Sequence, residues 1–150
     1  MASFTHLDGQ GRAHMIDISA KPPLKRTAVA RGHIALQPAT VALLRGGGVP
    51  KGDAIATARL AGIMAAKRTP EIIPLCHPIL LSHIAVAVAV EDAGVTVTAT
   101  VSCTGATGVE MEALTAVSAA LLSVYDMCKA VDKTMIISAI SLLEKRKEQP

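Results

Sequence analysis

Nine titratable side chains of this 150-residue chain stand outside the apolar patterns that would bury them. Cations dominate the set in the first half of the chain, and acids with one lysine make up the set in the long apolar segment near the end. A carboxylate beside a lysine can tune which of the two carries a proton, and clustered cations favour an anionic ligand. These residue types predict a site that binds a phosphorylated compound and moves protons. The nine residues are Asp17, Arg26, Lys51, Lys67, His77, Glu110, Glu112, Asp126 and Lys129.

Several familiar catalytic patterns are absent from the sequence. The glycine run Gly46–Gly48 lies close to Lys51, but the spacing of a phosphate-binding P-loop is not met. Neither a G-x-S-x-G elbow nor the glycine fingerprint of a dinucleotide site is present. The cysteines Cys76, Cys103 and Cys128 are odd in number and widely spaced, so they predict neither a disulfide framework nor a zinc site.

Two proline-containing segments leave alternatives open. Two prolines four residues apart exclude a regular helix over Ile72–Ile79 and predict a stiff loop that carries Cys76 and His77. His77 fits a buried structural histidine and a ligand-contacting one equally well. The basic stretch Lys21–Arg26, extended by Pro22-Pro23, is either a solvated loop or an anion-binding arm. Arg26 suits the second alternative because its planar guanidinium matches phosphate.

The element that must position most of the acids is a long helix predicted over Thr107–Lys133, with Thr107 as a candidate cap. Its charges lie only at the two ends, an arrangement that the helix dipole already favours. Apolar residues recur at steps of three and four, as expected of one helix face. They are Leu114, Val117, Leu121, Val124, Cys128 and Val131.

The geometry of this helix predicts a shared site. Asp126 lies about 40° from Glu112 around the axis, whereas Glu110 lies on nearly the opposite side from Asp126. The 14 residues between Glu112 and Asp126 span about 21 Å, which is too far for one small substrate to touch both ends. If both clusters serve one site, the start of one helix must meet the end of a second subunit's helix.

The remaining segments predict an α+β fold, an antiparallel sheet with helices on one face, in a single domain over residues 14–143. Residues 1–13 are expected to form a flexible arm and residues 144–150 a solvated tail. Asp53 is a candidate N-cap, and the clearest hairpin turns at Gly94. We expect strands over His14–Ser19, Thr27–Leu36, His83–Glu91, Val95–Ser102 and Met135–Leu143, and further helices over Pro38–Leu44 and Ala54–Lys67.

Composition restricts the partners and the compartment. Hydrophobic residues make up 51% of the chain but include one Phe, one Tyr and no Trp, so the core must be built from small aliphatic residues. Such a surplus in a short chain favours burial between subunits. The net charge of +3, without long basic runs or stacking aromatics, argues against nucleic acid. No membrane span or signal peptide is expected, which predicts a cytoplasmic protein.

Several stretches, in order and over nearly the whole chain, resemble the molybdenum cofactor biosynthesis protein C family, the cyclic pyranopterin monophosphate synthases. The resemblance implies a ferredoxin-like fold assembled as a homohexamer, a trimer of dimers, with sites at the dimer interface. It also implies conversion of 3′,8-cyclo-7,8-dihydroguanosine 5′-triphosphate to cyclic pyranopterin monophosphate with release of pyrophosphate. The stretches are Ile73–Pro78, Lys51–Arg59, Gly62–Lys67, Thr107–Thr115 and Tyr125–Ala130.

By matching these motifs, the resemblance implies that Asp126, Lys129 and Lys51 are catalytic. The residues it implies for substrate contact are Leu75, Cys76, His77, Met111 and Glu112, with Arg26 and Lys67 on the triphosphate and Glu110 on the purine or pterin portion. No protein-bound cofactor or metal is expected, although Mg²⁺ can accompany the triphosphate.

Two positions depart from the family pattern, and two rival functions remain open. Ala106 stands where many relatives carry a charged residue, and Glu144–Pro150 replaces a tail that contains Gly and Lys. The rivals are a relative that binds the nucleotide without turnover and a structural or partner-binding module. Titration with purine nucleotides separates the module, which should not bind them, from the other two.

Overall fold

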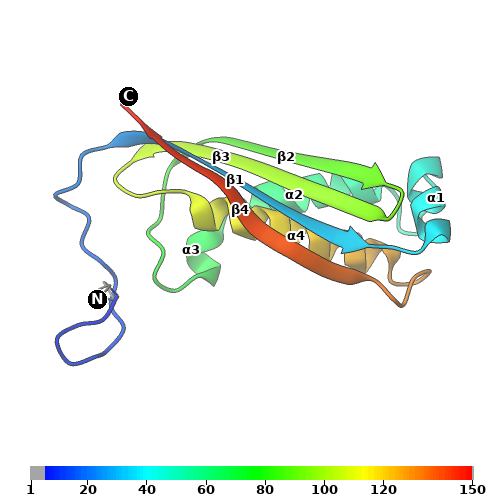
Figure 1. Ribbon diagram of the computed structural model, residues 1–150, viewed down its shortest axis with the longest axis horizontal. Helices are drawn as coiled ribbons and strands as arrows, with labels where there is room; N and C mark the ends of the chain where they lie inside the picture. Colours follow the sequence, from blue (N-terminus) through cyan, green and yellow to red (C-terminus); the bar gives the residue numbers. More distant parts are fainter. Residues whose placement is uncertain (1–5, 150) are drawn as a thin grey trace.

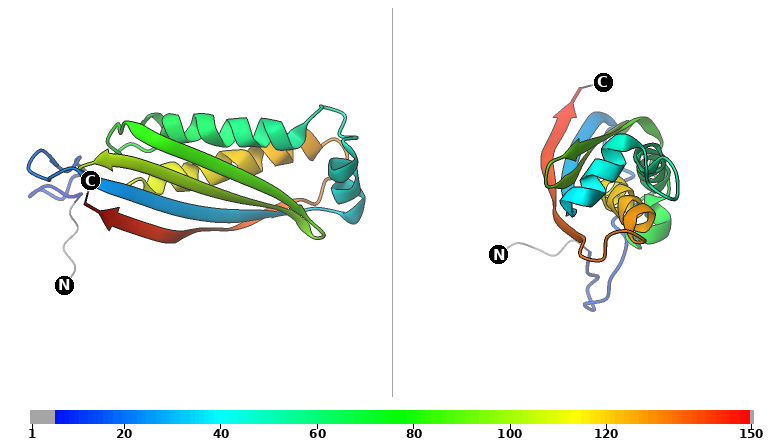
Figure 2. Two further views of the ribbon diagram at one scale, coloured as in Figure 1. Left: turned by 90° about the horizontal axis from the view of Figure 1, so that it is seen from above. Right: turned by 90° about the vertical axis from the view of Figure 1, so that its right-hand side faces the viewer.

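The computed structural model describes residues 6–149 and has two layers, a sheet and the helices that cover one of its faces (Figures 1 and 2). The four strands are all antiparallel to their neighbours, in the order β2-β3-β1-β4. The elements are β1 (Leu24–Ala35), α1 (Pro38–Gly46), α2 (Ala54–Lys67), α3 (Thr69–Ile72), β2 (Leu81–Glu91), β3 (Gly94–Gly105), α4 (Glu110–Cys128) and β4 (Ile136–Glu148). The α+β class with helices on one face is therefore confirmed.

Small apolar residues form the core between the sheet and the two long helices, α2 and α4. Along β1 and β3 the residues on the helix side are buried, and β3 places threonines and a serine on the other side. Gly62 of α2 lets the helices approach closely, because a Cβ there would lie 3.0 Å from the carbonyl oxygen of Ala116 in α4. Without large aromatic residues, the core relies on this close backbone approach.

Local signals set the ends of α1 and α2, although α1 continues two residues beyond its predicted end at Leu44. The carboxylate of Asp53 accepts a hydrogen bond from the N–H of Ala56 at 2.9 Å, which confirms the predicted N-cap, and α2 has the predicted bounds. Helix α1 begins at Pro38 and ends before Gly47, whose φ of 68° is in the left-handed region. Asp53 thus fixes the entry of the chain into α2, next to Lys51.

The last strand runs past its predicted end. β4 continues to Glu148, and residues 144–148 pair with β1 from Val29 back to Lys25. The expectation of a solvated tail after Leu143 is therefore wrong for the backbone, although the side chains of this part are exposed. An edge strand needs only main-chain hydrogen bonds on one side, so charged side chains can remain in water while the strand forms.

Two other predictions of local structure are wrong, and one short helix was not predicted. His14–Ser19 contains no strand, because Asp17 turns the chain by accepting hydrogen bonds from the N–H and hydroxyl of Ser19. Helix α4 begins at Glu110 after Val109, so Thr107 is not its cap. The short helix α3, which the sequence did not predict, precedes the proline-containing loop.

β4 has a bulge where it pairs with β1 next to Gly32. The register of the two strands shifts between Arg31 and His33, and Ala139 in the bulged part has a φ of 54°. A Cβ at Gly32 would lie within 2.9 Å of side-chain atoms of Val117, Leu121 and Ile140. Glycine is therefore required where α4 and the bulge meet over β1.

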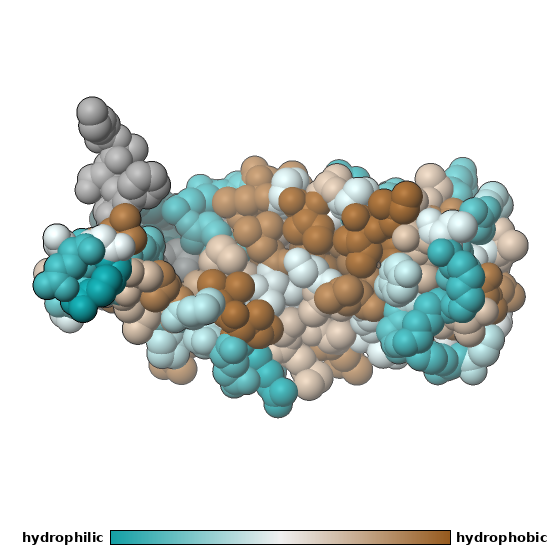
Figure 3. All heavy atoms as spheres, turned by 90° about the horizontal axis from the view of Figure 1, so that it is seen from below, coloured by the Kyte–Doolittle hydropathy of each residue, from teal (hydrophilic) through white to brown (hydrophobic). Residues whose placement is uncertain are grey.

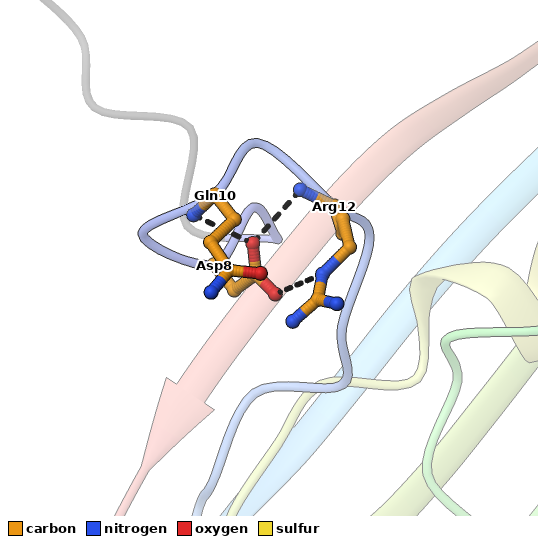
Figure 4. A network of polar contacts seen from close by, with 3 residues as sticks. All are labelled: Asp8, Gln10 and Arg12. Carbon is orange, nitrogen blue, oxygen red and sulfur yellow. Dashed lines mark hydrogen bonds and ion pairs between the residues drawn. The ribbon is translucent and has the colours of Figure 1, made fainter.

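The described part of the N-terminal segment forms a closed turn (Figure 4). Asp8 accepts hydrogen bonds from the N–H groups of Gln10 and Arg12 and pairs with the Arg12 guanidinium, each at 2.9 Å. The backbone hydrogen bond from Arg12, followed by its side-chain hydrogen bond, lowers the pKa of Asp8. The flexible arm expected over residues 1–13 lies partly outside the described residues, and its part from residue 6 onward has this local order.

Two surface properties bear on how the molecule is used. Helix α4 is long and apolar enough to cross a membrane by length and composition alone, but half of it is buried in the fold, as expected of a core helix. Seen from below, hydrophobic surface extends along the middle of the face on which α4 and β4 lie (Figure 3). Exposed apolar residues on these two elements are Leu122, Tyr125, Ile136, Ile140, Leu142 and Leu143.

Candidate functional site

The three residues predicted to be catalytic meet at the C-terminal end of α4. The carboxylate of Asp126 lies 2.8 Å from the Nζ of Lys51 and 2.6 Å from the Nζ of Lys129, using one oxygen for each. Lys129 follows one turn later on the same helix, and Lys51 comes from the loop before α2. The side chains are about half exposed, at 41%, 53% and 54% for Lys51, Asp126 and Lys129. We call these three residues the triad.

The electrostatics of the triad fix two of its protonation states. The hydrogen bond from Lys129, followed by that from Lys51, lowers the pKa of Asp126 to about 2. The hydrogen bond to Asp126 and its negative charge in turn raise the pKa of Lys129. At neutral pH Asp126 is therefore a carboxylate and Lys129 is an ammonium group.

A pocket of about 300 Å³ lies at the other end of α4. Its walls come from the N-terminal segment, the proline-containing loop, the β3–α4 loop and the first turn of α4. Six of the eight residues expected to contact substrate line it: Leu75, Cys76, His77, Glu110, Met111 and Glu112. We call this cavity the α4 pocket.

His77 attaches the N-terminal segment to the pocket wall. Its Nε2 lies 2.8 Å from the carbonyl oxygen of Ile16, which can only accept, so Nε2 donates. A neutral His77 then keeps Nδ1 as an acceptor. The structure therefore places His77 half-buried at the pocket with a defined tautomer.

Burial governs the acid and the thiol in the pocket. Glu112 is only 3% exposed, and burial, followed by the charge of Glu110, raises its pKa. Burial also raises the pKa of the Cys76 thiol, as do the charges of Glu112 and Glu110. Cys76 is thus a neutral thiol at neutral pH, which suits contact with a ligand better than nucleophilic attack.

Glu110 has a cationic partner that the sequence did not indicate. Its Oε1 forms an ion pair with the Nζ of Lys145, from the unpredicted part of β4. Burial raises the pKa of Glu110, but the hydrogen bond from Lys145, the backbone N–H of Glu110 and the charges of Lys145 and Arg26 together outweigh this effect, so the pKa is lowered. Glu110 and Glu112 therefore line one pocket with pKa values moved in opposite directions.

The two cations expected at the triphosphate do not line the α4 pocket. Arg26 is 9% exposed, and its guanidinium donates to the carbonyl oxygens of Gly105 at 2.9 Å and Ala106 at 3.1 Å. The Arg26 side chain therefore supports the backbone of the β3–α4 loop. Because it binds main-chain carbonyl groups, this contact does not depend on the side chain at position 106. Lys67 is exposed at the end of α2, near the same end of the molecule.

Lys21 is the pocket residue whose omission from the expected site matters most. It begins the basic stretch that leads into β1 and brings a cation to the wall of a pocket that also holds two glutamates. The sequence feature that could have indicated Lys21 is the proline pair after it, because Pro22-Pro23 keeps the chain extended. The other unpredicted residues of the wall are His6, Ile16, Ile18, Ile79, Thr107 and Gly108.

The chain is similar to known proteins over nearly its whole length. The profile of the MoaC family matches residues 15–148. A relative from Roseiflexus castenholzii, named cyclic pyranopterin monophosphate synthase, is 58% identical over 97% of this chain and 93% of its own length. Relatives of the same name from Chloroflexus aggregans and Pelotomaculum thermopropionicum are 59% and 52% identical, over 95% and 97% of this chain and 87% and 86% of their own lengths. With a profile match that spans both the triad and the α4 pocket, this chain belongs to the MoaC family.

Proposed function

We propose that this chain is a cyclic pyranopterin monophosphate synthase of molybdenum cofactor biosynthesis. Its substrate is 3′,8-cyclo-7,8-dihydroguanosine 5′-triphosphate, and its products are cyclic pyranopterin monophosphate and pyrophosphate. The observation that carries the proposal is the triad, in which one carboxylate holds two ammonium groups on an accessible surface. The names of the relatives support the reaction.

The active site is proposed to form between two copies of the chain. Glu112 in the pocket and Asp126 in the triad are 14 residues apart in one straight helix, or about 21 Å. A substrate bound in the α4 pocket therefore reaches the triad of a second copy more readily than that of its own. A two-fold axis would create two such sites at once, and three such dimers would give the expected homohexamer.

The protonation states assign separate roles in the chemistry. Lys129 is an ammonium group, so it enters the reaction as a proton donor, and Asp126 orients it and balances its charge. Opening the purine-derived ring requires such a donor at nitrogen. The triad also carries more positive than negative charge, which stabilises the charge that develops on the departing pyrophosphate.

The α4 pocket is proposed to bind the base portion. Its glutamates accept hydrogen bonds from N–H groups of the ring, and the apolar wall formed by Leu75 and Met111 covers the ring faces. Lys21 in the pocket wall and the exposed Lys67 at the same end of the molecule favour the triphosphate in this region, and the buried Arg26 adds positive charge behind the β3–α4 loop. A Mg²⁺ ion can arrive with the triphosphate, and no cofactor held by the protein is required in this scheme.

Pyrophosphate release from the cyclised nucleotide tests the proposal. The native chain should release one pyrophosphate for each substrate consumed, and Lys51→Ala, with unchanged fold and assembly, should release it at least about 100-fold more slowly. Saturable binding of the substrate without release would instead support the rival that binds without turnover. Failure to bind any purine nucleotide would support a structural module.

A further inference from the structure

We infer that Gly108 and Lys145 are positioning residues that together hold the carboxylate of Glu110 at the rim of the α4 pocket. Both residues are outside the set expected to act on the substrate. The inference rests on the proposed function for its consequence in catalysis, because Glu110 is the proposed acceptor for N–H groups of the base. Its structural part can be tested without turnover.

The first support is the space over Gly108. A Cβ at this position would lie 2.0 Å from Oε2 of Glu110 and 2.7 Å from its Cδ, so the carboxylate fills the volume that any other side chain would need. Gly108 does not have a positive φ, so its backbone does not itself require glycine. We therefore infer that glycine is needed at position 108 because it leaves room for the carboxylate of Glu110.

The second support is the ion pair with Lys145. Lys145 lies opposite Ala28 in the β4–β1 ladder, so its backbone is fixed by the sheet rather than by a mobile tail. Its Nζ binds Oε1, and the side chain of Glu110 is only 21% exposed. One carboxylate oxygen is thus engaged by the lysine, while the other lies over Gly108.

The chemical consequence is a fixed anionic acceptor. Because the pair keeps Glu110 ionised, its free lone pairs can accept from adjacent N–H groups, such as those on the amidine-like edge of a guanine-derived ring. Burial raises the pKa of Glu112, whereas the contacts of Glu110, first among them that with Lys145, lower the pKa of Glu110, so Glu112 takes up a proton at higher pH. The charged partner at Glu110 therefore keeps the two acids from exchanging roles.

Matched variants separate this role from general stability. Gly108→Ala should displace the carboxylate, and Gly105→Ala is its control, because a Cβ there meets only the sulfur of Cys103 at an ordinary 3.6 Å. Lys145→Met removes the charge, and Lys147→Met is its control on the same side of the same strand. Lys145→Arg restores a cation and should restore the native behaviour.

The first readout is the titration of the Glu110 carboxyl carbon by NMR in the ligand-free protein. Gly108→Ala and Lys145→Met should each raise the pKa of Glu110 by about one unit, and both controls should leave it unchanged. An unchanged pKa in the two test variants would overturn the inference. This result does not depend on whether the chain releases pyrophosphate, so failure of the proposed function would be seen separately.

The second readout is steady-state turnover. The two test variants should raise KM by about tenfold with little change in kcat, because a placed acceptor for the base is lost while the triad is intact. Lys145→Arg should recover most of the loss. Equal KM values in test and control variants, with the native chain active, would show that Glu110 needs no such support and would overturn the catalytic part of the inference.

Discussion

Asp126 is the residue on which the electrostatics of the triad depend. Its two oxygens bind different lysines, one from its own helix and one from the loop before α2. A single carboxylate therefore orients Lys129, raises its pKa and holds Lys51 in place. Neither ion pair is expected to contribute much to stability, because all three side chains are about half exposed.

Replacing Asp126 should change the pKa and the orientation of Lys129 before it changes the fold. In Asp126→Asn the hydrogen-bonded anion that raises the pKa of Lys129 is lost, so this pKa should fall toward the ordinary lysine value. Turnover should decrease by about 100-fold, since the donor is no longer oriented. The measurements are the pH titration of the Lys129 side chain by NMR and the rate of pyrophosphate release. An unchanged Lys129 titration would contradict the assignment.

Residue types predicted an anion-binding site that moves protons, and the resemblance to a known family added which residues belong to it. The one acid and two lysines of the triad, and six residues of the α4 pocket, lie in family motifs whose residues are close together in sequence. Lys145 could not be found in this way, because it reaches Glu110 only through the pairing of β4 with β1. Arg26 was expected on phosphate, but its burial and its two carbonyl contacts depend on the loop above it.

Elements with strong local signals were predicted well, and those stabilised by distant partners were not. The bounds of α2 follow from the Asp53 cap, and the β2–β3 hairpin follows from its alternation. The charged end of β4 looks solvated in sequence, yet β1 supplies its hydrogen bonds. Thr107 was predicted to cap α4 because of its residue type. The cap residue is instead Val109, whose side chain is buried, so tertiary packing outweighed the local preference for threonine.

The contact of α4 with the β1–β4 bulge predicts a sensitive position in the sheet. Gly32→Ala would place a Cβ within 2.9 Å of three apolar side chains, so the free energy of unfolding should fall by about 1–3 kcal/mol. Gly46→Ala is the control, because no atom lies within 4 Å of its added Cβ. Urea unfolding of both variants gives the comparison. Equal stability would mean that α4 and the bulge can move apart freely.

The connection between α4 and β4 is fastened to α1 by Asp132. This buried carboxylate accepts hydrogen bonds from the N–H of Gln37 at 2.8 Å and the hydroxyl of Thr40 at 3.0 Å, and Thr134 adds two more. Burial raises the pKa of Asp132, but these hydrogen bonds outweigh it, so the pKa is below the ordinary value of 3.8.

A lowered carboxyl pKa gives stability that is present above the unfolded pKa and lost as pH falls through the folded one. Asp132→Asn should therefore be less stable than the native chain by about 1–3 kcal/mol at pH 7, and the difference should shrink as pH falls below about 3.8. Thermal unfolding of both proteins across this range measures it. A difference that is constant with pH would show that the charge of Asp132 is not involved.

At the scale of the whole molecule, the two ends of α4 carry complementary parts of one proposed site. In the proposed scheme, the pocket end binds the base portion of the substrate and the triad end supplies the ammonium groups. Between them lies the hydrophobic surface of α4 and β4 (Figure 3). Such a surface suits contact with another copy of the chain, which would also bring the two ends together.

Mixing two inactive variants tests this division. Lys51→Ala disables the triad and His77→Ala disables the pocket, so each alone should be inactive. Co-expression should produce mixed dimers in which one site has both defects and the other has none, which restores about a quarter of native activity for random pairing. Activity of the mixture no higher than that of the separate variants would contradict a site shared between copies.

The edge strand β4 also affects how readily the sheets of different copies of the chain pair with one another. β4 is at the edge of the sheet, and a long edge strand is a template on which further strands can add. Its apolar first half is distorted by the bulge at Ala139, and residues 144–148 are all charged. Both features hinder strand addition, so the end of the chain protects the sheet from growth into fibrils. Shortening it would expose the neighbouring edge of β1 and make the protein more prone to aggregate.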